Sequence, residues 1–163
     1  MSILAPSDFT GKFAISKAFN DGNSKIQEYI DHYEKIYLND LFGAELCKLF
    51  IAGYVSTLIY TKLFDPFEED ICNDVVISEG VEIMLKCFIY AHYQREDLGV
   101  STSTGNVIMN PEGGQKQSDN YNVSFTPYNQ GIKTYRAIQA FINDNKKDYP
   151  SFNGKDKQTT WYI

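Results

Sequence analysis

The residue types that carry most metal and nucleophile chemistry are scarce in this 163-residue sequence, which has two histidines and three cysteines. Cys47, Cys72 and Cys87 form no CxxC pair, and neither His32 nor His92 has a metal-binding partner at short spacing. The sequence contains no GxSxG nucleophile motif and no GxxxxGK(S/T) phosphate loop. We therefore expect a protein that is not an enzyme, with no catalytic residue, no metal and no cofactor.

Long hydrophobic runs are also missing. The longest uncharged apolar stretch, Leu49 to Thr61, is too short to span a bilayer and contains Gly53, Ser56 and Thr57. The first residues turn polar within a few positions, which does not fit a secretory signal. Three cysteines without a pairing framework fit a reducing cytoplasm. We expect no membrane partner.

Lysine and arginine are absent from residues 65 to 82, although the chain holds 15 of them. This segment contains seven acidic residues, and the rest of the chain is almost neutral, so the segment accounts for the net charge of -6. Such a run is usually a solvated face, but it could also contact a basic partner or repel a nucleic-acid backbone. The acidic residues are Asp65, Glu68, Glu69, Asp70, Asp74, Glu79 and Glu82.

Aromatic residues are abundant, with 12 Tyr and 11 Phe, and they gather in a helical pattern over residues 24 to 43. Ser24 can cap this helix and Gly43 can end it in a left-handed conformation. One interpretation is that its tyrosines pack in the core with their hydroxyls at the edge; another is that some lie on a surface covered by a further subunit. The expected apolar stripe is Ile26, Tyr29, Ile30, Tyr33, Ile36, Tyr37 and Leu41.

Two shorter patterns follow this helix in the sequence. The first predicts a short helix from Ala44 to about Ile51, with Leu46, Leu49 and Phe50 on one side. The second predicts a helix that is capped by Ser78, ends at Gly99 and carries His92 on its apolar face.

A late segment also has helical spacing. Thr126 is expected to cap it with Pro127 at the first helical position, and Pro150 closes it. Its apolar face is Tyr128, Ile132, Tyr135, Ile138, Phe141 and Ile142.

Together these patterns predict a mainly α protein of one domain, a small helical bundle with a protruding β-hairpin or long loop and extended termini. The expected parts are an amino-terminal arm (1–22), the first part of the helical core (23–99), the hairpin or loop (100–125), a carboxy-terminal core helix (126–150) and a tail (151–163).

The three parts outside the core supply candidate interface residues. The arm offers apolar anchors, the hairpin is expected to pair residues 107–109 with residues 121–125, and the tail ends in three bulky residues that could fold back on the bundle or dock on a partner. The candidates are Phe9, Phe13, Val107, Ile108, Met109, Tyr121, Val123, Phe125, Trp161, Tyr162 and Ile163.

Two segments, "IQEYIDHYEKIYLNDLFGAELCKLF" (26–50) and "GIKTYRAIQAFINDNKKDYPSF" (131–152), give the chain a resemblance to a known family. Together with the order of the parts, they resemble the head-tail connector (head-completion adaptor) proteins of tailed bacteriophages, in the style of phages of gut Bacteroidales, including crAss-like phages. The resemblance implies a virion structural protein, assembled in the host bacterial cytoplasm as a dodecameric homo-oligomeric ring. Its implied partners are the portal protein and a tail or neighbouring ring protein, with DNA only as passing cargo. The alternative is a small, non-enzymatic, phage-encoded regulatory or inhibitor module.

Overall fold

A computed structural model describes residues 2–15, 22–71, 73–96, 100–102, 105–108, 115–116 and 121–156; for 22–24 and for the described residues from 100 to 125 it describes the backbone. The described chain is mainly helical, as the sequence predicts. Its α-helices are α1 (Gly22–Phe42), α2 (Ala44–Gly53), α3 (Leu58–Phe64), α4 (Gly80–Glu96) and α5 (Tyr121–Asp144). Two 3-10 turns, η1 (Pro6–Asp8) and η2 (Gly11–Phe13), precede them.

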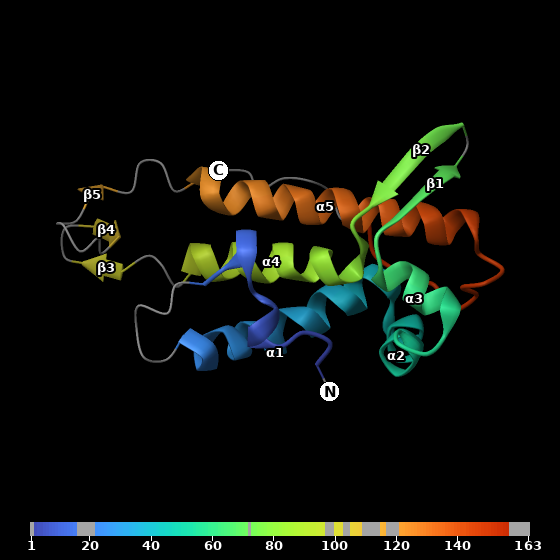
Figure 1. The fold of residues 1–163 in the computed structure, drawn as a ribbon, viewed down its shortest axis with the longest axis horizontal. Helices are drawn as coiled ribbons and strands as arrows, with labels where there is room; N and C mark the ends of the chain where they lie inside the picture. Colours follow the sequence, from blue (N-terminus) through green and yellow to red (C-terminus); the bar gives the residue numbers. More distant parts are fainter. Residues whose placement is uncertain are drawn as a thin grey trace.

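The three long helices form the body of the molecule, with α4 lying between α1 and α5 (Figure 1). Because α4 is covered from several sides, its burial extends well beyond one apolar stripe and includes Lys86, which pairs with Glu82 at 2.6 Å. The apolar face predicted for α5 is confirmed. The largest fully buried side chains are Ile26, Ile30, Leu38, Leu41, Phe42, Leu46, Phe50, Leu63, Met84, Leu85, Phe88 and Tyr135.

The stripe predicted for α1 is confirmed apart from one residue. Ile36 is exposed, whereas Glu34 is buried. The end of α1 is also as predicted, since Gly43 follows it with a positive φ of 79°. This conformation lets α2 begin at once in a new direction. On α2, Leu46 and Phe50 are buried as expected, but Leu49 is exposed.

Two small antiparallel sheets extend from the body (Figure 1). The first is a hairpin of β1 (Phe67–Ile71) and β2 (Asp74–Ser78), with Phe67 opposite Ser78 and Ile71 opposite Asp74. The second consists of β3 (Val100–Thr102), β4 (Gly105–Ile108) and β5 (Gln115–Lys116). The two sheets lie towards opposite ends of the molecule.

The hairpin expected within residues 100–125 exists, but the pairing predicted for it is wrong. Val107 on β4 pairs with Val100 and Lys116, whereas Tyr121, Val123 and Phe125 belong to the first turns of α5. Pairing segments that are close in sequence costs less loop entropy. The alternation of Tyr121, Val123 and Phe125 is also weak evidence for a strand. Tyr121 and Phe125 are four residues apart, so they share one face of a helix as well.

Two of the three predicted helix caps are also wrong, because Ser24 lies inside α1 and Thr126 lies inside α5. Pro127 lies inside α5 instead of at its first position, so the helix continues through a residue that cannot donate a backbone hydrogen bond. Ser78 ends β2, and α4 begins two residues later at Gly80, whose backbone N donates to Ser78 Oγ at 3.1 Å. Helix α5 ends at Asp144, earlier than the predicted end at Pro150. A turn leads from Asp144 to Tyr149 and Pro150.

Candidate interaction surfaces

The β1–β2 hairpin has two unlike faces, because strand side chains alternate. Its inner side packs on the body, where the Phe67 ring lies 4.9 Å from the ring of Phe141 on α5, and Glu69 pairs with Lys62 on α3. Its outer side points to solvent. We call this outer side the hairpin face; it consists of Glu68 and Asp70 on β1 and of Val75 and Ile77 on β2.

On the hairpin face, the register sets each carboxylate directly opposite an apolar residue. Glu68 pairs with Ile77 and Asp70 pairs with Val75. The two apolar residues are strongly exposed, at 51% for Val75 and 66% for Ile77. An isolated two-stranded hairpin has little stability in water. The packing of Phe67 on α5 therefore holds in place a sheet whose outer side covers nothing within the described chain.

A second set of exposed residues lies on α2, at the start of α3 and in the turn between them. We call this set the helical corner; it consists of Lys48, Leu49, Val55 and Leu58. Val55 is 77% exposed and Leu58 is 84% exposed, the highest values among the large apolar residues of the described chain. The turn is held by hydrogen bonds from Ser56 N and Thr57 N to the carbonyl oxygen of Gly53, at 3.0 and 2.8 Å.

The seven acidic residues of 65–82 do not form one acidic face. Besides Glu69, two others are paired with side chains of the helices: Glu79 accepts a hydrogen bond from Gln130, and Glu82 pairs with Lys86. These three carboxylates are half-buried, because residues 65–82 form the β1–β2 hairpin and the first turn of α4. The exposed members are Asp65, Glu68, Asp70 and Asp74.

The tyrosines of α1 pack onto α4, as the first interpretation of the sequence expects. Tyr33 stacks on His92 with ring centroids 3.8 Å apart, and Tyr37, which is buried, has its hydroxyl 2.7 Å from His92 Nε2. The Tyr33 hydroxyl donates to Glu96 at 2.9 Å. Burial is the largest cause of the raised pKa of Tyr37, so this hydroxyl stays protonated and serves as a hydrogen-bond partner. The cluster joins α1 to α4.

The described part of the amino-terminal arm, residues 2–15, packs against its own bundle. The interface candidates Phe9 and Phe13 are buried in the core of the chain, so their prediction as anchors for a neighbour is contradicted. Glu34 on α1 fixes the arm: its carboxylate accepts hydrogen bonds from Ile3 N at 2.9 Å and Leu4 N at 3.0 Å. The helical pattern does not indicate this role, because Glu34 looks like a polar residue on an amphipathic helix.

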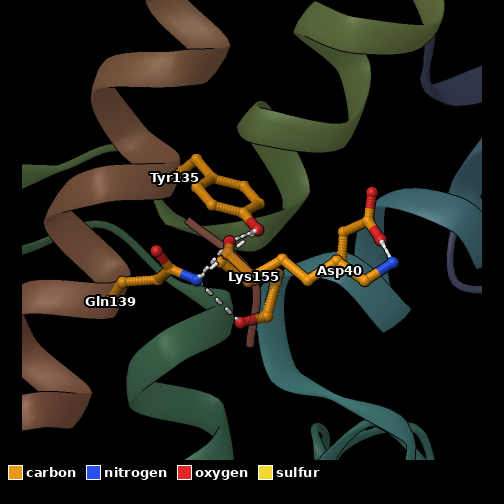
Figure 2. Close-up of polar contacts among 5 residues, drawn as sticks. Asp40, Tyr135, Gln139 and Lys155 are labelled. Carbon is orange, nitrogen blue, oxygen red and sulfur yellow. Dashed lines mark hydrogen bonds and ion pairs between the residues drawn. The ribbon is translucent and has the colours of Figure 1, made fainter. Parts of the chain in front are cut away.

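The start of the tail closes the end of α1 (Figure 2). A helix leaves its last carbonyl groups without helical partners. Here Lys155 N donates to the Asp40 carbonyl at 2.7 Å, Gln139 Nε2 donates to the Leu41 carbonyl at 3.2 Å, and Asn153 N donates to the Phe42 carbonyl at 3.1 Å.

The same segment is held on its other side by α5. Tyr135 donates its hydroxyl to the Lys155 carbonyl at 2.6 Å, and Gln139 Nε2 lies 3.0 Å from that oxygen (Figure 2). Lys155 Nζ also pairs with Asp40 at 2.9 Å. The chain is thus anchored as far as Lys155 between α1 and α5.

The remaining interface candidates lie in the sheet at the other end of the molecule, in the first turns of α5 or outside the described residues. For Val107 and Ile108 the structure describes the backbone in β4. Met109, Trp161, Tyr162 and Ile163 lie outside the described residues. Among the residues that are described, no group of three His, Cys, Asp or Glu side chains is placed to hold a metal ion.

No single described helix is long and apolar enough to cross a membrane; α2 and α3 would pass on length and composition only as a pair, and they are bent by 98°. The surfaces that remain as candidates for function are the hairpin face and the helical corner. No family model, curated protein or solved structure matches this chain.

Proposed function

We propose that this chain is a virion structural protein, the subunit of a head-tail connector ring that bridges the portal to the tail or to the next ring of a tailed bacteriophage. The observation that carries the proposal is the hairpin face, a projecting sheet with exposed Val75 and Ile77. Exposed apolar surface beside polar residues is typical of interaction sites. The resemblance of residues 26–50 and 131–152 to connector proteins supplies the biological setting.

The described body suits a subunit that works by being held between neighbours. Its long helices are joined by buried aromatic contacts, and the start of its tail is fixed by hydrogen bonds to α1 and α5. A rigid body with projecting surfaces loses little conformational entropy when it assembles. The proposed partners are further copies of the chain in a dodecameric ring, the portal protein and a tail or ring protein.

Passing DNA is the proposed cargo. The exposed carboxylates Asp65, Glu68, Asp70 and Asp74 carry negative charge at the surface. Electrostatic repulsion acts over about 8 Å at physiological salt. If the hairpin borders the channel of the ring, these groups keep phosphates from adhering to the wall.

The proposal is tested with an amber mutation in the gene of this chain in its phage. A connector role predicts heads that are filled with DNA but do not join tails, and it predicts recovery of infectious particles when the chain is supplied from a plasmid. Normal tailed particles in the mutant infection would contradict the proposal. A mutant with normal particles but altered host response would instead support the regulatory module.

A further inference from the structure

We infer that β2 of one copy pairs, edge to edge and antiparallel, with β2 of a second copy, so that the two hairpins form one four-stranded sheet. The pairing uses backbone hydrogen bonds at the edge of the sheet. The inference goes beyond the proposed function and does not rest on it. A contact with twofold symmetry joins two copies and stops there, whereas a ring needs a contact that propagates.

The second edge of β2 has no strand beside it in the described chain, since β2 pairs with β1 alone. In an antiparallel pair, alternate residues turn their N–H and C=O groups towards the partner strand and the others turn them away. Val75 is of the second kind, because its N donates to the side chain of Asp74 at 2.9 Å. Ile77, two residues on, therefore also turns its backbone groups to the free edge.

The two strands of the hairpin differ in how well their edges are protected. Proteins protect edge strands with charged side chains, proline or a bulge. Strand β1 carries three successive acidic residues, Glu68 to Asp70. Strand β2 has its one charge at its first residue, continues with β-branched residues that suit a paired strand, and pairs with β1 without a bulge. The edge of β2 is thus the one open to a further strand.

A second β2 fits this edge over its whole length. Antiparallel pairing then sets Val76 opposite its own copy and Val75 opposite Ile77 of the other copy. Both residues of such a pair turn their backbone groups to this edge, so they exchange two hydrogen bonds. Their side chains lie on the outer side of the sheet, where opposite β-branched residues stabilise the pairing.

Charge decides against the other two pairings of the same edges. Pairing β1 with a second β1 would set Glu68 opposite Asp70 of the other copy, and like charges directly opposite are destabilising. Pairing β2 with a second β1 would enclose each exposed apolar residue between two carboxylates. In the sheet that we infer, the carboxylates stay on the two outer strands. Three strand spacings, about 14 Å, separate them, which exceeds the screening length of about 8 Å at physiological salt.

The placement of the hairpin suits this contact. The body lies under its inner side, where Ser78 is buried and Val76 is half-buried. The hairpin projects from the body (Figure 1). In an antiparallel pairing the base of each hairpin lies beside the tip of the other, so the two bodies leave the shared sheet at opposite ends.

Sedimentation velocity of the full chain over a range of concentrations tests the inference. We expect a monomer–dimer equilibrium without larger species. Ile77→Pro removes a backbone donor from the free edge of β2 and should weaken dimerisation at least about tenfold. Glu68→Pro is the matched control, because Glu68 lies opposite Ile77 and the change removes the corresponding donor from the outer edge of β1. It should dimerise like the wild type. Thermal unfolding of each variant verifies that it is folded.

Hydrogen exchange of single amides in the wild type tests the pairing without a substitution. In the dimer the amides of Val75 and Ile77 should exchange at least about tenfold more slowly than in the monomer, and those of Glu68 and Asp70 should not change. A chain that stays monomeric, or a dimer without this protection, would overturn the inference. Slower exchange on both strands would show pairing of β2 with a second β1 and would overturn it too.

The outcomes of this test and of the amber test are independent. Dimers with protected β2 amides together with normal particles from the amber mutant would keep the contact and remove the connector function. Tailless heads from the amber mutant together with a monomeric chain would keep the function and remove the contact.

Discussion

Glu34 is a charged residue that is 4% exposed, and it shows how single residues hold the ends of this chain. A buried carboxylate is costly unless its oxygens accept hydrogen bonds. Here the backbone N–H groups of Ile3 and Leu4, together with the Ser2 hydroxyl at 2.9 Å, supply them. The arm is therefore fixed by a polar contact as well as by its buried phenylalanines.

Replacing Glu34 by Ala should release the arm. The change removes the acceptor of these hydrogen bonds at a cost of about 2 kcal/mol, since bonds to a charged group are among the stronger ones. The expected result is faster tryptic cleavage at Lys12, which is exposed on η2. Glu28→Ala, at an exposed position on the same helix, should leave the rate unchanged. Equal cleavage of both variants would contradict this role of Glu34.

The burial of Tyr149 predicts that the protein loses stability at alkaline pH. Its side chain is buried and donates to the Ile59 carbonyl at 2.7 Å, and burial raises its pKa from 10.0 to about 12. The folded state thus holds this proton more tightly than the unfolded state. The resulting stability is complete below pH 10 and is lost as the pH rises through about 12.

The Tyr149→Phe variant should show a smaller fall in the free energy of unfolding between about pH 10 and 12 than the wild type, because one late-titrating group is gone. It should also be less stable near neutral pH by about 1 kcal/mol, from the lost hydrogen bond. Urea unfolding at several pH values measures both. Tyr54→Phe is the control for the neutral loss, since the Tyr54 hydroxyl makes no hydrogen bond to any described residue. An unchanged pH slope in Tyr149→Phe would refute the assignment.

At the scale of elements, Gly80 lies where β2, α3 and α4 meet. It is the first residue of α4, follows β2, and lies against the carbonyl oxygen of Phe64 at the end of α3. Its φ is 83°, and an added Cβ would overlap that oxygen. The hairpin can leave the body at this angle because no side chain is present there.

Gly80→Ala should therefore cost about 3 kcal/mol or more, from backbone strain together with the displaced end of α3. Gly11→Ala is the matched control: Gly11 also has a positive φ, of 60°, but an added Cβ there would meet nothing within 4 Å. It should cost only the strain of about 1 kcal/mol. Denaturant unfolding compares the two, and equal losses would show that the close approach to α3 is unimportant.

Sequence patterns predicted the helices where a long apolar period decides the structure. They located α1, its end at Gly43, and the buried face of α5. They missed the β1–β2 hairpin, because Glu69 sits on its inner side between Phe67 and Ile71 and hides the alternation. At that half-exposed position Glu69 pairs with Lys62, which comes from another element.

The candidate surfaces were predicted less well than the helices. Val55 and Leu58 belong to an apolar run that looks like core in the sequence, yet the turn after α2 exposes both. Phe9 and Phe13 looked like free anchors and are buried. Exposure depends on how distant elements pack, which local patterns do not encode. The acidic run of residues 65–82 is evident in the sequence. Which of its strand carboxylates are exposed follows from the register of the hairpin.

At the scale of the whole molecule, the body is a helical bundle that projects a different structure at each end. The hairpin and the helical corner lie towards one end, and the sheet of β3, β4 and β5 lies at the other (Figure 1). Exposed apolar residues and exposed carboxylates thus lie together at one end of the molecule. The proposed connector subunit would use this polarity to contact its own copies on its flanks and other proteins above and below.

The most direct test of the connector proposal is the copy number of this chain in purified tailed particles, measured by quantitative mass spectrometry against the portal protein. The proposal predicts that the chain remains in the particles through purification at one copy per portal subunit. Detection of the chain in the cytosol of infected cells together with its absence from purified particles would contradict it.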